Sequence, residues 1–155
     1  MEKLKSLSQI KKIVKKAKKL GKRIVFTNGC FDLIHKGHIK LLKNAKKQGD
    51  ILILGLNSDN SVRKLKGKKK PIYSQKERAR ILSHFSYVDY IIIFNELTPR
   101  KLIKNIVPDV LVKGKDYTNK KIVGKEIVEA KGGRVVLVPL LKGYSTTKLI
   151  RNKGD

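Results

Sequence analysis

RIVFTNGCFDLIHKGH, residues 23–38, contains the strand, turn and helix pattern that indicates the fold class. Residues 24–27 are apolar or β-branched and predict a buried strand over 23–27. Turn-forming residues break that strand at 28–32, and an amphipathic pattern predicts a helix over 37–48. His35 and His38 share one face at the start of this helix. Because a strand–loop–helix unit presents helix N–H groups there, the arrangement favours anion binding and chemistry on a nucleotide phosphate.

The rest of the chain alternates apolar runs with amphipathic ones. It predicts strands over 51–56, 88–94, 110–112 and 134–139, and helices over 59–65, 75–84, 98–106, 124–131 and 145–152. Thr98 and Pro99 are expected to be the N-cap and first residue of a helix. This alternation predicts an α/β, Rossmann-like fold, with a parallel sheet of about five strands and helices on both faces. In such sheets ligands bind at the carboxyl ends of the strands, at the switch point.

The first twenty residues predict a separate amphipathic helix. Its apolar stripe over residues 3–20 ends at Gly21 and consists of Leu4, Leu7, Ile10, Val14, Ala17 and Leu20. We expect residues 1–21 to pack on the core and residues 22–155 to form a single domain. A membrane-surface helix is the alternative, and it is less favoured because the segment has no Trp or Phe anchor.

The composition is strongly basic, with 38 Lys and Arg against 12 Asp and Glu and a formal net charge of +26. Nucleic-acid binding, steering of a polyanionic small substrate, and lysine-rich solvated faces would each account for this charge. We favour the last, because the lysines are spread along the chain without interleaved surface aromatics. A lone cysteine, no signal-peptide pattern and no apolar run near the roughly 20 residues of a membrane span predict a cytoplasmic location without membrane contact.

Several familiar sites are excluded or disfavoured. Neither a P-loop nor a G-x-G-x-x-G after the first strand is present. Zinc at His35 and His38 is disfavoured because two ligands are too few, so no protein metal site is predicted. Cys30 is expected to be a small buried side chain rather than a nucleophile.

Two later stretches are candidates for the same site. Three hydroxyl residues after Tyr144, at 145–147, predict either an ordinary N-cap or an anion site at a helix start, and the spacing leaves both open. Residues 111–117 form a charged, glycine-broken turn directly after a predicted buried strand.

Taken together, these residues resemble the cytidylyltransferase-like nucleotidyltransferase superfamily, whose mark is His-x-Gly-His. Residues 27–38 look like its first motif, and residues 144–147 look like its closing Ser-Thr-Thr motif. Residues 57–59, 65–67, 71–72, 77–78 and 111–117 look most like D-glycero-β-D-manno-heptose 1-phosphate adenylyltransferase. Lys115 departs from the Gly or Asp often found there. In that family the transferase is often fused to a sugar kinase and also occurs alone.

The resemblance implies transfer of AMP from ATP to a sugar 1-phosphate, with Mg²⁺ bound mainly through the ATP phosphates. It also implies a separate sugar kinase upstream, and homodimers are common among related enzymes. The implied catalytic residues are His35, His38, Lys66 and Arg78. The implied nucleotide and phosphate contacts are Thr27, Asn28, Gly29, Phe31, Asp32, Gly37, Lys113, Gly114, Asp116, Tyr117, Ser145, Thr146 and Thr147. The alternatives are a cytidylyltransferase acting on glycerol 3-phosphate or a similar phosphorylated alcohol, and a basic nucleic-acid-binding protein.

Overall fold

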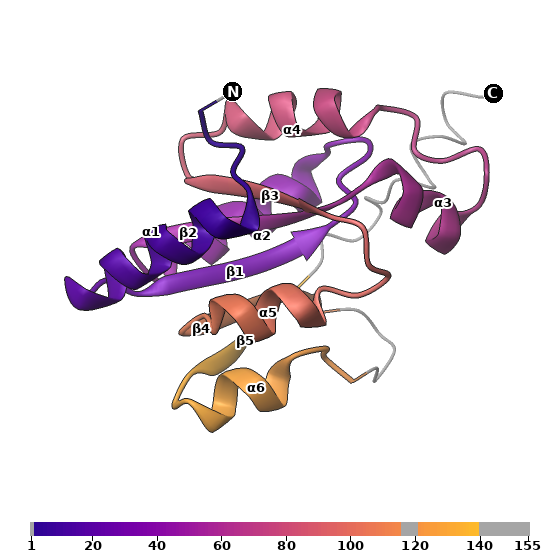
Figure 1. Ribbon diagram of the computed structural model, residues 1–155. Helices are drawn as coiled ribbons and strands as arrows, with labels where there is room; N and C mark the ends of the chain where they lie inside the picture. Colours follow the sequence, from indigo (N-terminus) through magenta and orange to yellow (C-terminus); the bar gives the residue numbers. More distant parts are fainter. Residues whose placement is uncertain (1, 116–120, 140–155) are drawn as a thin grey trace.

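The computed structural model describes residues 2–115 and 121–139. Within them, one sheet contains β1 (Ile24–Gly29), β2 (Ile51–Asn57), β3 (Tyr90–Phe94), β4 (Val110–Lys115) and β5 (Arg134–Pro139). The strand order is β3-β2-β1-β4-β5, and every neighbouring pair is parallel. The predicted α/β, Rossmann-like fold is therefore confirmed (Figure 1).

Helices cover both faces of this sheet. The described helices are α1 (Leu7–Lys19), α2 (Lys36–Lys47), α3 (Asp59–Lys66), α4 (Gln75–Ser83), α5 (Arg100–Ile106) and α6 (Lys125–Ala130). α1, α5 and α6 pack on one face, and α2 and α4 pack on the other (Figure 1). Among the described helices none is long and apolar enough to cross a membrane. The predicted helix over 145–152 lies outside the described residues.

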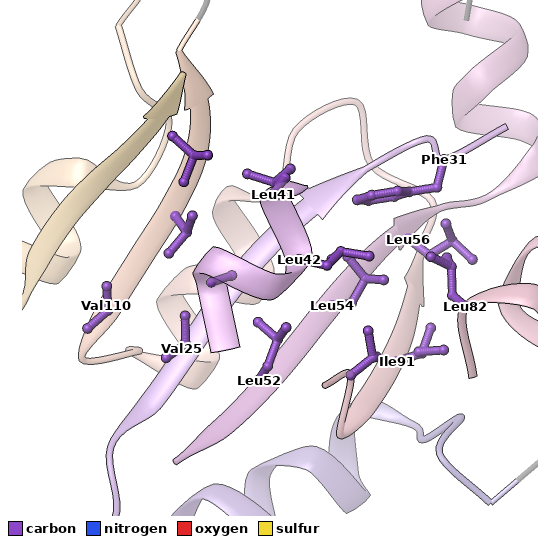
Figure 2. Packing of buried hydrophobic residues seen from close by; sticks show 14 of the residues in the cluster. Val25, Phe31, Leu41, Leu42, Leu52, Leu54, Leu56, Leu82, Ile91 and Val110 are labelled. Carbon is purple, nitrogen blue, oxygen red and sulfur yellow. The ribbon is translucent and has the colours of Figure 1, made fainter. Parts of the chain in front are cut away.

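Side-chain alternation along the strands builds two apolar layers. Leu52, Leu54 and Leu56 of β2 join the cluster under α2 and α4, which Figure 2 shows. Ile53 of the same strand joins the cluster under α1, α5 and α6. Burying each such side chain fully is worth roughly 1.5–3 kcal/mol. β2 is therefore apolar on both faces, as a central parallel strand requires.

The N-terminal segment differs from the prediction. Ser6 is an N-cap that forms a capping box with Gln9, so the helix begins at Leu7 rather than near residue 3. Lys3 to Lys5 run along the edge of β3 instead, and the Ile91 N–H donates to the Lys3 carbonyl at 2.9 Å. Leu20 is 65% exposed, so its predicted place in the apolar stripe is wrong. The division into residues 1–21 and 22–155 stays a prediction.

The start of α5 also lies slightly later than predicted. Pro99 occupies the N-cap position, and Arg100 is the first helical residue. Thr98 still accepts a hydrogen bond from the Arg100 N–H, at 3.4 Å. The predicted assignment of Thr98 as cap is therefore shifted by one residue, with its side chain retaining a contact to the first turn.

Candidate active site

The sheet parts at its switch point. β1 pairs with β4 only through Val25 and Phe26, whereas its pairing with β2 continues to Gly29. β4 in turn pairs with β5 as far as Lys115. The carboxyl ends of β1 and β4 therefore separate where the strand order reverses, which is the place where open α/β sheets bind ligands.

Two side chains link the strands at this point. The Thr27 hydroxyl of β1 donates to the Val112 carbonyl of β4 at 2.8 Å. Beyond it, the Lys113 ammonium donates to the Asn28 side-chain oxygen. Burial lowers the pKa of Lys113 to about 8. The switch point thus carries a desolvated amine whose described partner is a neutral amide, and such a group suits an incoming anion.

Both histidines of the motif cap α2. His35 is the N-cap in an extended conformation, and its Nδ1 accepts from the Gly37 N–H at 3.1 Å. The Nδ1 of His38 accepts from the His35 N–H at 3.3 Å, which completes a capping box. Because both Nδ1 atoms are acceptors, each neutral ring carries its proton on Nε2. Sequence reasoning missed this box, since imidazole is not a usual capping group.

The environment keeps the two rings neutral. Burial lowers the pKa of His35. Burial, followed by the neighbouring His35 and Lys66, lowers the pKa of His38 to about 4. The ring centroids lie 3.9 Å apart. At neutral pH the pair therefore presents Nε2–H groups that can donate hydrogen bonds without bringing a charge.

The loop between β1 and α2 packs against His38. The Phe31 ring is 3% exposed, and its centroid lies 5.1 Å from that of His38. In Figure 2 this ring lies near Leu56, at the carboxyl end of β2. A Cβ on Gly29 would approach the Phe31 ring to 2.8 Å, so the close packing requires glycine there.

Lys66 supplies a positive charge within electrostatic range of His38. Lys66 is the last residue of α3, its side chain is exposed, and its charge reaches His38 strongly enough to lower the imidazole pKa. Gly67 then ends the helix with a φ of 101°. The predicted role of Lys66 in the site stays a prediction.

Arg78 and Asp32 lie inside the protein rather than at its surface. The Arg78 side chain is fully buried and pairs with Asp59 at 2.9 Å. The Asp32 carboxylate, 2% exposed, accepts from the N–H groups of Ile72 and Tyr73 at 2.7 and 2.8 Å. Both predicted site residues thus lie beside the site and contact protein groups.

The remaining predicted residues divide into two groups. Gly37 is buried in the first turn of α2, and Gly114 lies half-buried in β4, next to Lys113. The others lie outside the described residues: Asp116, Tyr117, Ser145, Thr146 and Thr147. Among the described residues, no three His, Cys, Asp or Glu side chains come together in a group that could hold a metal ion.

Comparisons with known sequences show which proteins this chain is similar to. Residues 26–152 match the family model described as cytidylyltransferase-like. Bifunctional protein HldE of Geobacter metallireducens is 54% identical over 148 residues, which cover 96% of this chain and 30% of that protein. The same-named protein of Syntrophotalea carbinolica is 49% identical over 153 residues, or 99% of this chain and 31% of its own. The chain thus spans just under a third of the length of these relatives.

Solved structures show the same fold. The lipopolysaccharide core biosynthesis protein of Thermoplasma volcanium is 30% identical, with a TM-score of 0.63, and the match covers 81% of this chain and 100% of that one. Pantoate-beta-alanine ligase of Francisella tularensis has a TM-score of 0.69 at 16% identity, covering 96% of this chain and 72% of that one. The second likeness shows the fold alone.

Proposed function

The chain belongs to the cytidylyltransferase-like family, and from this membership we propose that it moves AMP from ATP to a sugar 1-phosphate, releasing pyrophosphate. The observation that carries the reaction class is the pair of neutral imidazoles at the start of α2, each with Nδ1 accepting a main-chain N–H and therefore with its proton on Nε2. Donors fixed before the reaction stabilise developing charge at a phosphorus without reorganising.

The proposed acceptor is D-glycero-β-D-manno-heptose 1-phosphate. Its support is the motif resemblance over residues 57–59, 65–67, 71–72, 77–78 and 111–117. The relatives named HldE, and a structural relative named for lipopolysaccharide core biosynthesis, agree with such a sugar. From the same resemblance we propose ATP rather than CTP as the donor of the nucleotidyl group.

The proposed reaction requires no general base from the protein. A phosphate monoester has its second pKa near 6, so the acceptor is already largely a dianion at neutral pH. The difficulty is the repulsion between two anions that must meet in line at the α-phosphorus. The protein must therefore align them and offset their charge.

In our proposal, different residues of the site donate hydrogen bonds, offset charge and shape the nucleotide pocket. His35 and His38 donate from Nε2 to oxygens of the reacting phosphate. Lys66 offsets charge on the triphosphate and the leaving pyrophosphate, and Lys113 does the same at the switch point. Thr27, Asn28, Gly29 and Phe31 shape the nucleotide pocket, and Ser145, Thr146 and Thr147 remain predicted holders of the β- and γ-phosphates.

We propose that Mg²⁺ is brought to the site bound to ATP. Mg²⁺ bound to ATP oxygens offsets charge on the transferring phosphate. In this proposal the ion is carried by ATP rather than held by a protein cage. A cytoplasmic location, a sugar kinase acting upstream and a homodimer belong to the same proposal.

Pyrophosphate release tests the proposal directly. The purified chain is given ATP or CTP, each with heptose 1-phosphate or glycerol 3-phosphate. We expect rapid release only with ATP and heptose 1-phosphate. Preference for CTP and glycerol 3-phosphate would replace it with the cytidylyltransferase alternative, and no release with any pair would reject nucleotidyl transfer.

A further inference from the structure

One buried arginine joins three segments that surround the site. The Nη1 of Arg78 donates to the carbonyls of Cys30 and Asn57, both at 2.7 Å. Its Nε donates to the Tyr73 carbonyl at 3.0 Å, and its Nη2 pairs with Asp59 at 2.9 Å. Four of the five guanidinium N–H groups are thus engaged, and the side chain has no exposed surface.

The buried Asp32 carboxylate binds the main chain of one of these segments, the turn before α4. Asp32 accepts from the N–H groups of Ile72 and Tyr73, while Arg78 donates to the Tyr73 carbonyl. The turn before α4 is therefore fixed by two charged side chains. Lys68 and Lys69, earlier in the same connection, are exposed.

Arg78 also acts on His38 indirectly, through the backbone of the loop after β1. It holds the carbonyl of Cys30, and the next residue is Phe31, whose ring packs on His38. Phe31 has a φ of 47°, a conformation that bulky residues adopt only when their surroundings impose it. The Arg78 contact to Cys30 is directly adjacent to this constrained residue.

We propose that Arg78 is a positioning residue and not a phosphate ligand. It holds the loop after β1, the start of α3 and the turn before α4 in one arrangement, and so fixes Phe31 against His38. The motif resemblance had implied direct contact between Arg78 and the triphosphate. Such contact would require the guanidinium to leave the half-buried Asp59 carboxylate and three main-chain carbonyls without their donor, which is unfavourable.

The first test uses Arg78→Lys, with Arg80→Lys on the exposed face of the same helix as control. Lysine keeps the charge but cannot reproduce the planar fork of bonds. The melting temperature of the ligand-free protein should fall by roughly 6 °C. In an NMR titration the pKa of His38 should rise from about 4 toward 6.5 as Phe31 loosens, with His35 and Lys66 still facing the ring. Arg80→Lys should change neither quantity.

The His38 titration separates positioning from a merely structural role. Loss of stability with a titration curve identical to that of the wild type would overturn the proposal, because the arginine would then support the fold without setting the histidine. Ligand-free stability equal to that of the wild type would overturn it too, because a surface phosphate ligand behaves in that way.

Asp59→Asn provides a second variant should Arg78→Lys not fold. The amide keeps the shape and one acceptor but removes the charge that pairs with Arg78. If Arg78 were a phosphate ligand restrained by Asp59, this change would free it and tighten ATP binding in calorimetry. Positioning predicts a lower melting temperature and a raised pKa of His38, and tightened ATP binding or an unmoved His38 titration would contradict it.

The proposal rests on the proposed function only in the role it gives His38. The ligand-free melting and titration measurements need neither ATP nor turnover. Adenylyl transfer is judged separately, on pyrophosphate release by the wild-type chain. Where that activity is present, Arg78→Lys should lower kcat more than it raises the KM for ATP.

Discussion

The imidazoles at the start of α2 owe their proton positions to the backbone. Each Nδ1 accepts a main-chain N–H, so a neutral ring has only Nε2–H to offer a substrate. The low pKa of His38 keeps it neutral well below neutral pH. In the proposed reaction these rings therefore act as hydrogen-bond donors and not as sources of a full positive charge.

Removing the His38 imidazole should abolish most of the activity. His38→Ala deletes a fixed donor, and losing one such donor typically costs about 3 kcal/mol of transition-state stabilisation. We expect kcat to fall about a hundredfold or more, measured by pyrophosphate release. His84→Ala is the matched control, since His84 is exposed at the end of α4. Near-normal turnover in a folded His38→Ala protein would contradict the assigned role.

Lys113 should make ATP binding pH-dependent on the alkaline side. Without ligand its pKa is lowered to about 8, and a phosphate beside the amine favours the charged form and raises that pKa. Below pH 8 the amine is already charged, whereas above it binding must take up a proton. ATP affinity should therefore fall as pH rises above about 8. Calorimetry near pH 9 in two buffers of different ionisation enthalpy measures the uptake.

Two neighbouring substitutions identify the group that takes up this proton. Lys113→Met should abolish the uptake, and Lys115→Gln, in the exposed last residue of β4, should retain it. Equal proton uptake in the wild type and in Lys113→Met would show that another group titrates.

At the scale of elements, the helix starts depend on individual caps. Ser6 accepts from the Gln9 N–H, and the Gln9 side chain accepts from the Ser6 N–H. Ser6→Ala removes half of this box and should lower the free energy of unfolding by about 1 kcal/mol. Thermal melting should show a decrease of about 2–4 °C. Ser8→Ala, within the first turn, should change little, and equal losses in both variants would exclude capping as the cause.

The strands could be predicted from the sequence because burial on both faces makes them nearly continuous apolar runs. Element boundaries were less predictable. Leu4 continues the helical apolar period, yet it pairs with β3, because Ser6 supplies a cap that starts the helix later. Val107 ends α5 in the left-handed region, which a β-branched residue rarely adopts and no pattern indicates.

The site was predictable in its residue types but not in its internal contacts. The spacing of His35 and His38 placed both at one helix start, and the structure agrees. A hydrophobic pattern counts Arg78 as polar, so it could not show that this side chain is fully buried. Its four acceptors come from three separate segments, and only the tertiary structure brings them together.

At the scale of the whole molecule, the net charge of +26 should act on encounter with ATP. The Asp59 carboxylate is paired with Arg78, so this ion pair adds little net charge near Lys66. Long-range attraction of a polyanion raises the association rate and is screened by salt. The association rate of a substrate attracted at long range should therefore fall with salt more steeply than that of a ligand bound by short contacts alone.

Salt should consequently lower kcat/KM for ATP far more than kcat. We expect kcat/KM to fall about tenfold between roughly 0.05 and 0.5 M NaCl while kcat changes little. Sucrose at matched osmolality is the control, because it leaves electrostatic screening unchanged.

Duplex DNA in the same salt series distinguishes the nucleic-acid alternative. Non-specific attraction to a basic surface predicts a Kd of about 10⁻⁴–10⁻⁶ M at physiological salt. Nanomolar binding there would instead make nucleic acid a partner of this chain, with its lysine-rich faces as the binding surface.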